Sequence, residues 1–376
     1  MSNNQPVSPR APVGIHSISF GREGGEAIPL ARHVVGGMPQ PVPGQPSIDG
    51  IEGLPASPTA FDLHEEIQPP QFVEDERNEP FVLLDGDRLS AQVVFRKDGS
   101  HDGDPLTIGA TGNLSNLTER RVELDFGAAG LSDPVSFASD RPASGGVEDS
   151  IWSLAWHVRT EGGVTTLGAT EHRVFRVLGR PTSPWGQAPL WVGALELACQ
   201  WARGATRQTE VAAAITHSLN THPLIRYHGT TTLGAYTFFL STFLLLLSRE
   251  AVFHINCTDC ASVIATLGNL LGCDLEERRL FEVNTRPFLK MSGDPTLESD
   301  WIERRWIYHE VGWRSGSGPK GQIFDGSLQL DADMNDRDTL RVPRAAADLD
   351  LKTYRELLVA SGACALGRSG ARRPIA

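Results

Sequence analysis

Residues 256–272 read NCTDCASVIATLGNLLG, and this stretch decides the fold of the second half of the chain. Its apolar residues recur at helical spacing and occupy nearly the whole circumference, which predicts a buried helix. Asn256 is suited to be the N-cap, and with Asp259 three residues later it forms the pattern of a capping box. Gly272 is placed to end the helix.

Cys257 falls at the first position of this predicted helix. Unpaired backbone N–H groups and the helix dipole favour negative charge there, so the position stabilises a thiolate. Cys257 is therefore the candidate nucleophile. We interpret Cys260 and Cys273 as small side chains of the hydrophobic core.

Two segments downstream, 306–311 and 322–328, are rich in strand-forming residues and are separated by a loop-like stretch at 314–319. An antiparallel hairpin centred on Ser317 places His309 directly opposite Asp325 on one face. In that register Asp325 orients the imidazole while the other ring nitrogen faces the thiol. The candidate catalytic residues are thus Cys257, His309 and Asp325.

These residues resemble the core of the transglutaminase-like superfamily, the papain-related Cys-His-Asp enzymes. The family's Cys-x-Asp-x-Ala motif and the Leu-Gly end of its helix are matched within residues 257–272, and its histidine and aspartate strands are matched by His309 and Asp325. The segment from Ala214 to Tyr227 is similar to the helix and Ile-x-Tyr stretch that precede the cysteine. The resemblance covers roughly residues 190 to 335.

The resemblance implies a thiol-dependent acyl-transfer enzyme that acts on a peptide or side-chain amide through an acyl-enzyme. Both a cysteine protease or amidase and a protein-glutamine acyltransferase fit. The sequence departs from the family pattern at Ile255 and Asn256, where a glycine is usual before the cysteine. It also departs at Trp313, the first aromatic after the histidine, and at Gly326-Ser327, where Pro-Thr is usual. These differences leave the substrate and the reaction branch open.

Other interpretations compete with the catalytic one. Cys257 and His309 can be ordinary buried residues, and Asp325-Gly326 is also typical of a turn. A non-catalytic protein-binding or scaffold protein that keeps the fold is the alternative function. A zinc site of Cys257, Cys260, Cys273 and His254 is excluded by a continuous helix, because the 13 residues from Cys260 to Cys273 then span roughly 20 Å.

The chain of 376 residues is expected to be an α+β protein with an N-terminal antiparallel β-sandwich ahead of the transglutaminase-like core. Residues 1–80 are rich in Pro, Gly and Ser and are expected to be extended or disordered, with Gly14 to Phe20 docking as an edge strand. Residues 81–184 form the predicted sandwich, 185–365 the catalytic domain and 366–376 a flexible tail.

Composition limits the partners of the protein. A net charge of −12 without a basic stripe argues against nucleic acid. The five cysteines and the lack of a signal sequence favour a cytoplasmic protein without a disulfide framework. The apolar run from Leu233 to Leu247 is shorter than a membrane span, so no membrane is expected. We expect a protein or peptide substrate and no cofactor or metal, and the sequence does not predict the oligomeric state.

Overall fold

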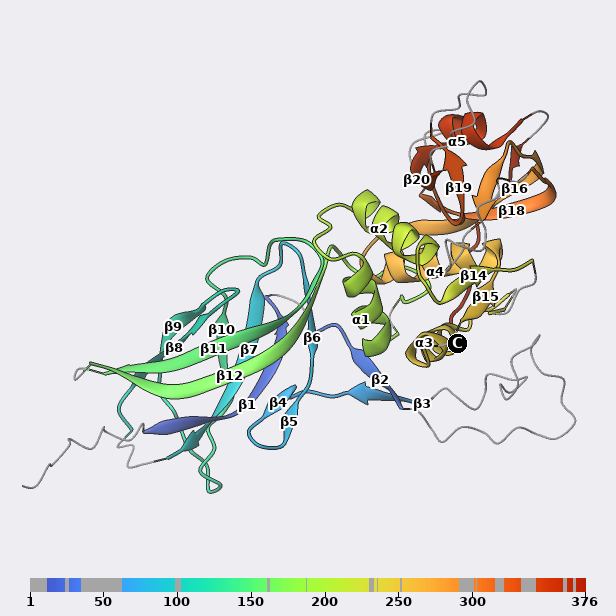
Figure 1. Cartoon of the computed structure of the whole chain (residues 1–376). Helices are drawn as coiled ribbons and strands as arrows, with labels where there is room; N and C mark the ends of the chain where they lie inside the picture. Colours follow the sequence, from blue (N-terminus) through green and yellow to red (C-terminus); the bar gives the residue numbers. More distant parts are fainter. Residues whose placement is uncertain are drawn as a thin grey trace, which may run out of the picture. The chain divides into compact units, whose positions relative to one another are not determined.

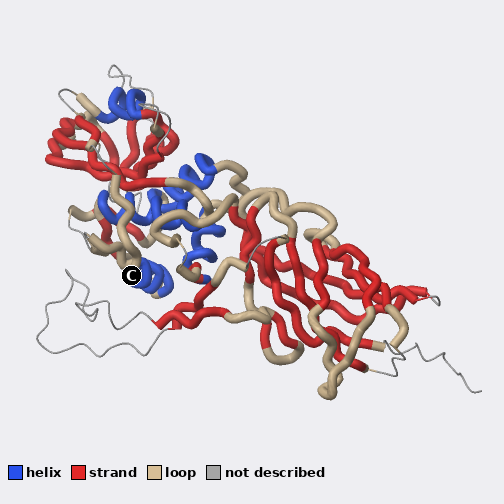
Figure 2. Tube along the Cα trace, turned by 180° about the vertical axis from the view of Figure 1, so that it is seen from behind, coloured by secondary structure: helices blue, strands red, loops and turns tan. Residues whose placement is uncertain are grey.

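The computed structural model describes residues 12–23, 27–34, 63–98, 103–160, 163–186, 188–229, 233–234, 236–250, 252–290, 301, 303–314, 321–332, 343–360, 364–367 and 370–376. The chain divides into two compact units. Unit 1 comprises residues 1–30 and 66–177, and unit 2 comprises residues 31–65 and 178–376. All helices of the described residues belong to unit 2, and both units contain strands (Figure 2).

Unit 1 holds two five-stranded sheets. The first has the order β10-β7-β1-β4-β5, and the second has the order β6-β12-β11-β8-β9. The strands of the first sheet are β1 (Val13–Arg22), β4 (Phe72–Val73), β5 (Arg77–Asn78), β7 (Leu89–Lys97) and β10 (Val135–Ala138). Those of the second are β6 (Phe81–Leu84), β8 (Leu106–Gly112), β9 (Leu117–Val122), β11 (Glu148–Thr160) and β12 (Gly163–Val177). Buried side chains from both sheets form one hydrophobic core.

Strand β1 corrects the expected boundary at residue 81. It is an inner strand of its sheet, paired on both sides with β4 and β7, and not an edge strand on a disordered segment. Its buried residues change from Val13 and Ile15 to Ile18 and Phe20, because a register shift between Ile15 and Ser17 moves the alternation by one. Residues 1–11, 24–26 and 35–62 lie outside the described residues.

Unit 2 combines helices with a six-stranded sheet of order β17-β19-β18-β16-β21, in which β20 also pairs with β19. The helices are α1 (Val192–Trp201), α2 (Gln208–Asn220), α3 (Leu240–Ser248), α4 (Cys257–Leu270) and α5 (Leu351–Leu358). The strands of the sheet are β16 (Leu275–Asn284), β17 (Phe288–Lys290), β18 (Arg305–Arg314), β19 (Gln322–Asp331), β20 (Pro343–Asp350) and β21 (Ala365–Leu366). The architecture as a whole is mixed and sheet-rich, compatible with the expected α+β class.

Smaller strands complete unit 2. Strands β14 (Ile225–Tyr227) and β15 (Phe253–Ile255) pair in parallel, and β15 directly precedes α4 in the chain. Strands β2 (Leu30–Val34) and β3 (Leu63–Ile67), most of whose residues belong to unit 2, form a three-stranded sheet with β13 (Leu190–Trp191). No helix in the described part of the chain is long and apolar enough to cross a membrane.

Helix α4 is buried along its whole length, as its all-round apolar pattern predicts. It packs against β16, β18 and β19 of the sheet and against α1 and α2 (Figure 1). Two glycines allow the close approach. A Cβ on Gly312 would lie 2.9 Å from Ile264 Cγ2, and a Cβ on Gly326 would lie 2.8 Å from Leu219 Cδ2. Asp325 and Gly326 both lie within strand β19, so they do not form a turn.

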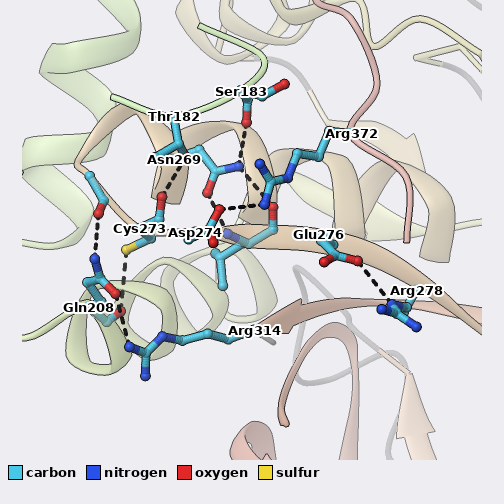
Figure 3. A network of polar contacts seen from close by, with 12 residues as sticks. Thr182, Ser183, Gln208, Asn269, Cys273, Asp274, Glu276, Arg278, Arg314 and Arg372 are labelled. Atoms are coloured by element: carbon cyan, nitrogen blue, oxygen red, sulfur yellow. Dashed lines mark hydrogen bonds and ion pairs between the residues drawn. The ribbon is translucent and has the colours of Figure 1, made fainter. Parts of the chain in front are cut away.

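The turn after α4 is held by polar contacts with other parts of unit 2 (Figure 3). Gly272 has a φ of +90°, which favours glycine, and accepts a hydrogen bond from Gln208 at 2.7 Å. Thr182 donates to the carbonyl of Cys273 at 2.6 Å. Asn269 donates to the carbonyl of Ser183 at 2.6 Å. These hydrogen bonds hold the C-terminal end of α4 in place within unit 2.

The hairpin of β18 and β19 differs from the predicted register by two residues. Gly312 pairs with Phe324, where a centre at Ser317 would pair it with Gln322. Because side chains alternate with a period of two, this shift leaves His309 and Asp325 on the same face. Ile307, two positions before His309, is 86% exposed, so burial on this face of β18 begins only at His309. The turn itself, residues 315–320, lies outside the described residues.

Candidate functional site

The start of α4 has the predicted capping geometry. The Asn256 side chain accepts from the backbone N–H of Asp259 at 3.1 Å. The Asp259 carboxylate accepts from the backbone N–H of Asn256, also at 3.1 Å. These bonds satisfy backbone groups that a helix start otherwise leaves unpaired. Cys257 therefore stands at the first position of a capped and buried helix.

His309 lies in β18 and Asp325 in β19, and their side chains are joined by a hydrogen bond. Nε2 of His309 donates to Oδ2 of Asp325 at 2.7 Å, and both residues are 1% exposed. Cys257 is close enough to the same imidazole to contribute to its pKa. Because Asp325 occupies Nε2, the ring nitrogen that remains for the sulfur is Nδ1. The structure thus brings all three predicted residues together.

The protonation of His309 follows from these neighbours. Burial by itself lowers its pKa, because it penalises the charged imidazolium. The charge of Asp325 and its hydrogen bond, together with the neighbouring Cys257, outweigh burial and raise the pKa to about 10. At neutral pH the ring is therefore an imidazolium beside the Asp325 carboxylate and the Cys257 sulfur.

Asp325 accepts four hydrogen bonds from protein groups. Ser327 donates to Oδ1 through its backbone N–H at 2.9 Å and its hydroxyl at 2.6 Å. The Tyr354 hydroxyl of α5 donates to Oδ2 at 2.6 Å, beside His309. Burial alone would raise the pKa of Asp325, but the His309 charge and these donors bring it below its usual value. The carboxylate stays ionised although it is buried.

Two aromatic residues border the site. Trp306 stacks on His309 with ring centroids 4.5 Å apart and an interplanar angle of 24°. Tyr227 lies at the end of β14, and burial, together with the neighbouring Cys257, raises the pKa of its hydroxyl. Its hydroxyl therefore remains protonated at neutral pH.

Sequence reasoning missed Tyr354, Trp306 and Tyr227 as neighbours of the site. Trp306 had a visible signal, since it is an aromatic residue three positions before His309. Nothing in the sequence around Tyr354 indicated its contact, because α5 reaches Asp325 only through the packing of the sheet.

The remaining cysteines are buried and form no disulfide. Cys260 is 1% exposed and Cys273 is 0% exposed. Burial raises the pKa of Cys260 well above its usual value and that of Cys273 to about 12. Helix α4 runs without a break from Cys257 to Leu270, which keeps Cys260 and Cys273 near opposite ends. Within the described residues, no group of three or more His, Cys, Asp and Glu side chains is arranged to hold a metal ion.

Comparison with known proteins gives distant similarity to solved structures. No protein-family model matches the chain, and no curated protein matches it. Among solved structures the chain is similar to red sea bream transglutaminase, with 14% sequence identity and a TM-score of 0.37. The match covers 66% of this chain and 49% of that one, so the chain spans about half the length of the transglutaminase. A similarity this weak says nothing about the chemistry of the site.

Proposed function

We propose that the protein is a thiol-dependent acyl-transfer enzyme of transglutaminase-like type, with Cys257, His309 and Asp325 as its catalytic triad. The observation that carries the proposal is the buried 2.7 Å pair of His309 and Asp325, together with a cysteine that influences the same imidazole and stands at a helix start. In this interpretation the two sheets of unit 1 are a β-sandwich and unit 2 is the catalytic core.

The first half of the reaction uses the thiolate and the imidazolium. The sulfur of Cys257 attacks the carbonyl carbon of a peptide or side-chain amide, and the carbonyl electrons move to oxygen. When the tetrahedral intermediate collapses, the C–N bond breaks and His309 gives its proton to the leaving amine or ammonia. The backbone N–H of Cys257 is one donor to the oxyanion. A thioester acyl-enzyme remains.

The second half returns the enzyme to its starting state. Water or a primary amine attacks the thioester while neutral His309 takes a proton from it, and the thiolate leaves. Asp325 is held by four donors, so it orients the ring and stabilises its charge instead of accepting its proton. Water gives hydrolysis, and an amine gives cross-linking.

The environment of the thiol supports this assignment over a structural cysteine. Cys257 is 8% exposed, whereas Cys260 in the next position of the same helix face is 1% exposed and has no imidazole partner. The scaffold alternative gives the pair of His309 and Asp325 a structural role only, and it predicts that Cys257 reacts as an ordinary thiol.

The test is alkylation of the thiols by iodoacetamide across pH, with each modified cysteine identified by peptide mass spectrometry. Cys257 is expected to react at about pH 6, where an unperturbed thiol is almost fully protonated. Cys260 is the control within the same protein. His309→Asn should slow labelling of Cys257 at this pH. If Cys257 reacts no faster than an unperturbed thiol, the catalytic assignment fails and the scaffold alternative stands.

The products formed by the wild-type protein show whether it is a peptidase, an amidase or a transferase. A glutamine-containing peptide is incubated with and without a fluorescent primary amine. Cleavage of the backbone indicates a peptidase, release of ammonia alone an amidase, and incorporation of the amine a transferase. Cys257→Ala should abolish whichever product forms, and Cys260→Ala should retain it.

A further inference from the structure

Residues 370–376, here called the C-terminal segment, are bound to the core of unit 2 and are not the flexible tail expected from the sequence. Ala371 and Glu277 of β16 exchange two backbone hydrogen bonds of 2.8 Å. At the other end Ala376 donates to the carbonyl of Phe238 at 3.0 Å and accepts from the hydroxyl of Ser241 at 3.1 Å. The segment therefore connects the edge of the sheet to the start of α3.

Two successive arginines of this segment make different contacts. Arg372 pairs with Asp274 in the turn after α4 (Figure 3). Both of these side chains are partly exposed, at 29% and 56%. Arg373 is buried, with a side chain 5% exposed. Alternation along an extended chain explains why only one of the two points into the core.

Arg373 enters a cluster of buried carboxylates. It pairs with Glu277 of β16, and its Nη2 donates to Glu310 Oε1 of β18 at 2.8 Å. Its Nη1 donates to the hydroxyl of Ser262 in α4 at 3.2 Å. The side chains of Glu277 and Glu310 are 2% and 1% exposed. One guanidinium thus joins the helix of the nucleophile to the strand of the histidine.

The cluster reaches both reacting residues through their sequence neighbours. Glu310 directly follows His309 in β18. Its Oε2 accepts a hydrogen bond from the Thr258 hydroxyl at 3.0 Å, and Thr258 directly follows Cys257. Arg373, Glu310 and Thr258 therefore form a continuous chain of hydrogen bonds that ends one residue from the thiol and one residue from the imidazole.

We propose that Arg373 is a positioning residue that sets the separation of Cys257 and His309 through Glu310, so that the C-terminal segment completes the active site. The inference rests on the proposed function and deepens it by adding a determinant of thiol reactivity. It predicts that the site is assembled only when this segment is bound.

The charge of Arg373 supports the same positioning role as its hydrogen bonds. Burial lowers the pKa of Arg373, whereas the nearby Asp259 and Cys257 favour its charged form. The guanidinium is charged at neutral pH and therefore holds Glu277 and Glu310 by charge as well as by hydrogen bonds.

The experiment compares the pH profile of Cys257 alkylation in full-length variants. Arg373→Met is combined with Glu277→Gln, so that one buried carboxylate is not left charged without its partner. Thr258→Val breaks the hydrogen bond to Glu310 with little change in shape. Arg373→Lys keeps the charge but not the planar fork. Arg372→Met is the matched control, because it removes the neighbouring, more exposed arginine.

The double variant is expected to label Cys257 about tenfold more slowly at about pH 6, because it breaks the link from Arg373 through Glu310 to Thr258 while removing one positive and one negative charge together. Thr258→Val should also slow labelling, because it breaks the same link at Glu310. Arg373→Lys should slow labelling less than the double variant, and Arg372→Met should match the wild type. A folded double variant that labels at the wild-type rate, or faster, overturns the proposal. If that variant does not fold, a wild-type profile in both Thr258→Val and Arg373→Lys overturns it.

A second measurement separates this inference from the proposed function. Amide hydrogen exchange reports the first turn of α4 and strand β18 without any chemistry at the thiol. Thr258→Val and Arg373→Lys should raise exchange at both places, and Arg372→Met should not. If wild-type Cys257 is unreactive, the proposed function fails, and unchanged exchange in these variants would in addition overturn the structural role of Arg373.

Discussion

Asp325→Asn tests the electrostatic core of the site, because it removes one charge and keeps the shape of the side chain. In the wild type the pKa of His309 is raised to about 10 from its ordinary value of 6.5. A rise of this size corresponds to about 5 kcal/mol of net stabilisation of the imidazolium, after the opposing effect of burial. Without the carboxylate charge, burial is the main influence left, and it lowers the pKa of His309. The ring of the variant should therefore be neutral at pH 7.

The sign of the stability change follows from the same values. A group whose folded pKa is raised contributes stability that is fully present below its unfolded pKa, here about 6.5, and is lost as pH rises through about 10. The wild type should therefore become less stable between these limits because of His309. Asp325→Asn should lack this decline and should be less stable by about 3–5 kcal/mol at neutral pH.

Two measurements check the prediction. NMR of histidine-labelled protein follows each ring through its titration, and His309→Asn identifies the signal. Urea unfolding at several pH values gives the free energy of unfolding. Asp133→Asn, at an exposed position in unit 1, is the matched control and should change neither result. A His309 signal in Asp325→Asn that still titrates with a midpoint near 10 would refute the ion-pair reasoning.

Two further variants, each with a control variant, test by urea unfolding the contacts that support the site. Tyr354→Phe removes the buried 2.6 Å hydrogen bond to the site carboxylate and should cost about 1.5–3 kcal/mol, as expected for a bond to a charged group. Tyr308→Phe, at a residue 40% exposed, should cost less than about 0.5 kcal/mol, and equal losses would contradict the role of the buried hydroxyl. Gly272→Ala combines a φ of +90° with a Cβ only 2.6 Å from Gly179 N, and should cost more than about 3 kcal/mol. Gly204→Ala, with a φ of +80° and open space around it, should cost only about 1–2 kcal/mol, and a similar loss in both would show that the contact with the neighbouring loop is unimportant.

The parts of the site that depend on local sequence were predictable. The N-cap, the capping box and the all-round burial of α4 follow from residues 256–272, and the structure confirms all three. The side-chain contact between His309 and Asp325 was predicted although the predicted register was wrong by two residues, because an even shift keeps side chains on the same face. The catalytic roles of these residues remain a prediction.

The parts that depend on distant contacts were not predictable. Tyr354 is 29 positions from Asp325, and Arg373 is 63 positions from Glu310. No periodicity connects such residues, since their contact is produced by the order of strands in the sheet. Strand β1 shows the same limit. Its alternation is visible in the sequence, but nothing local indicates that β4 and β7 lie on its two sides.

The burial of α4 on every side has a consequence for the order in which unit 2 folds. The helix has no face suited to water, and a segment of 14 residues is marginal as an isolated helix. It is stabilised only when β16, β18, β19 and the preceding helices have closed around it. The helix dipole, the imidazole and the buried guanidinium are then brought to the thiol in one cooperative step. An unfinished chain would carry Cys257 as an ordinary thiol, so its reactivity would report completed folding of the unit.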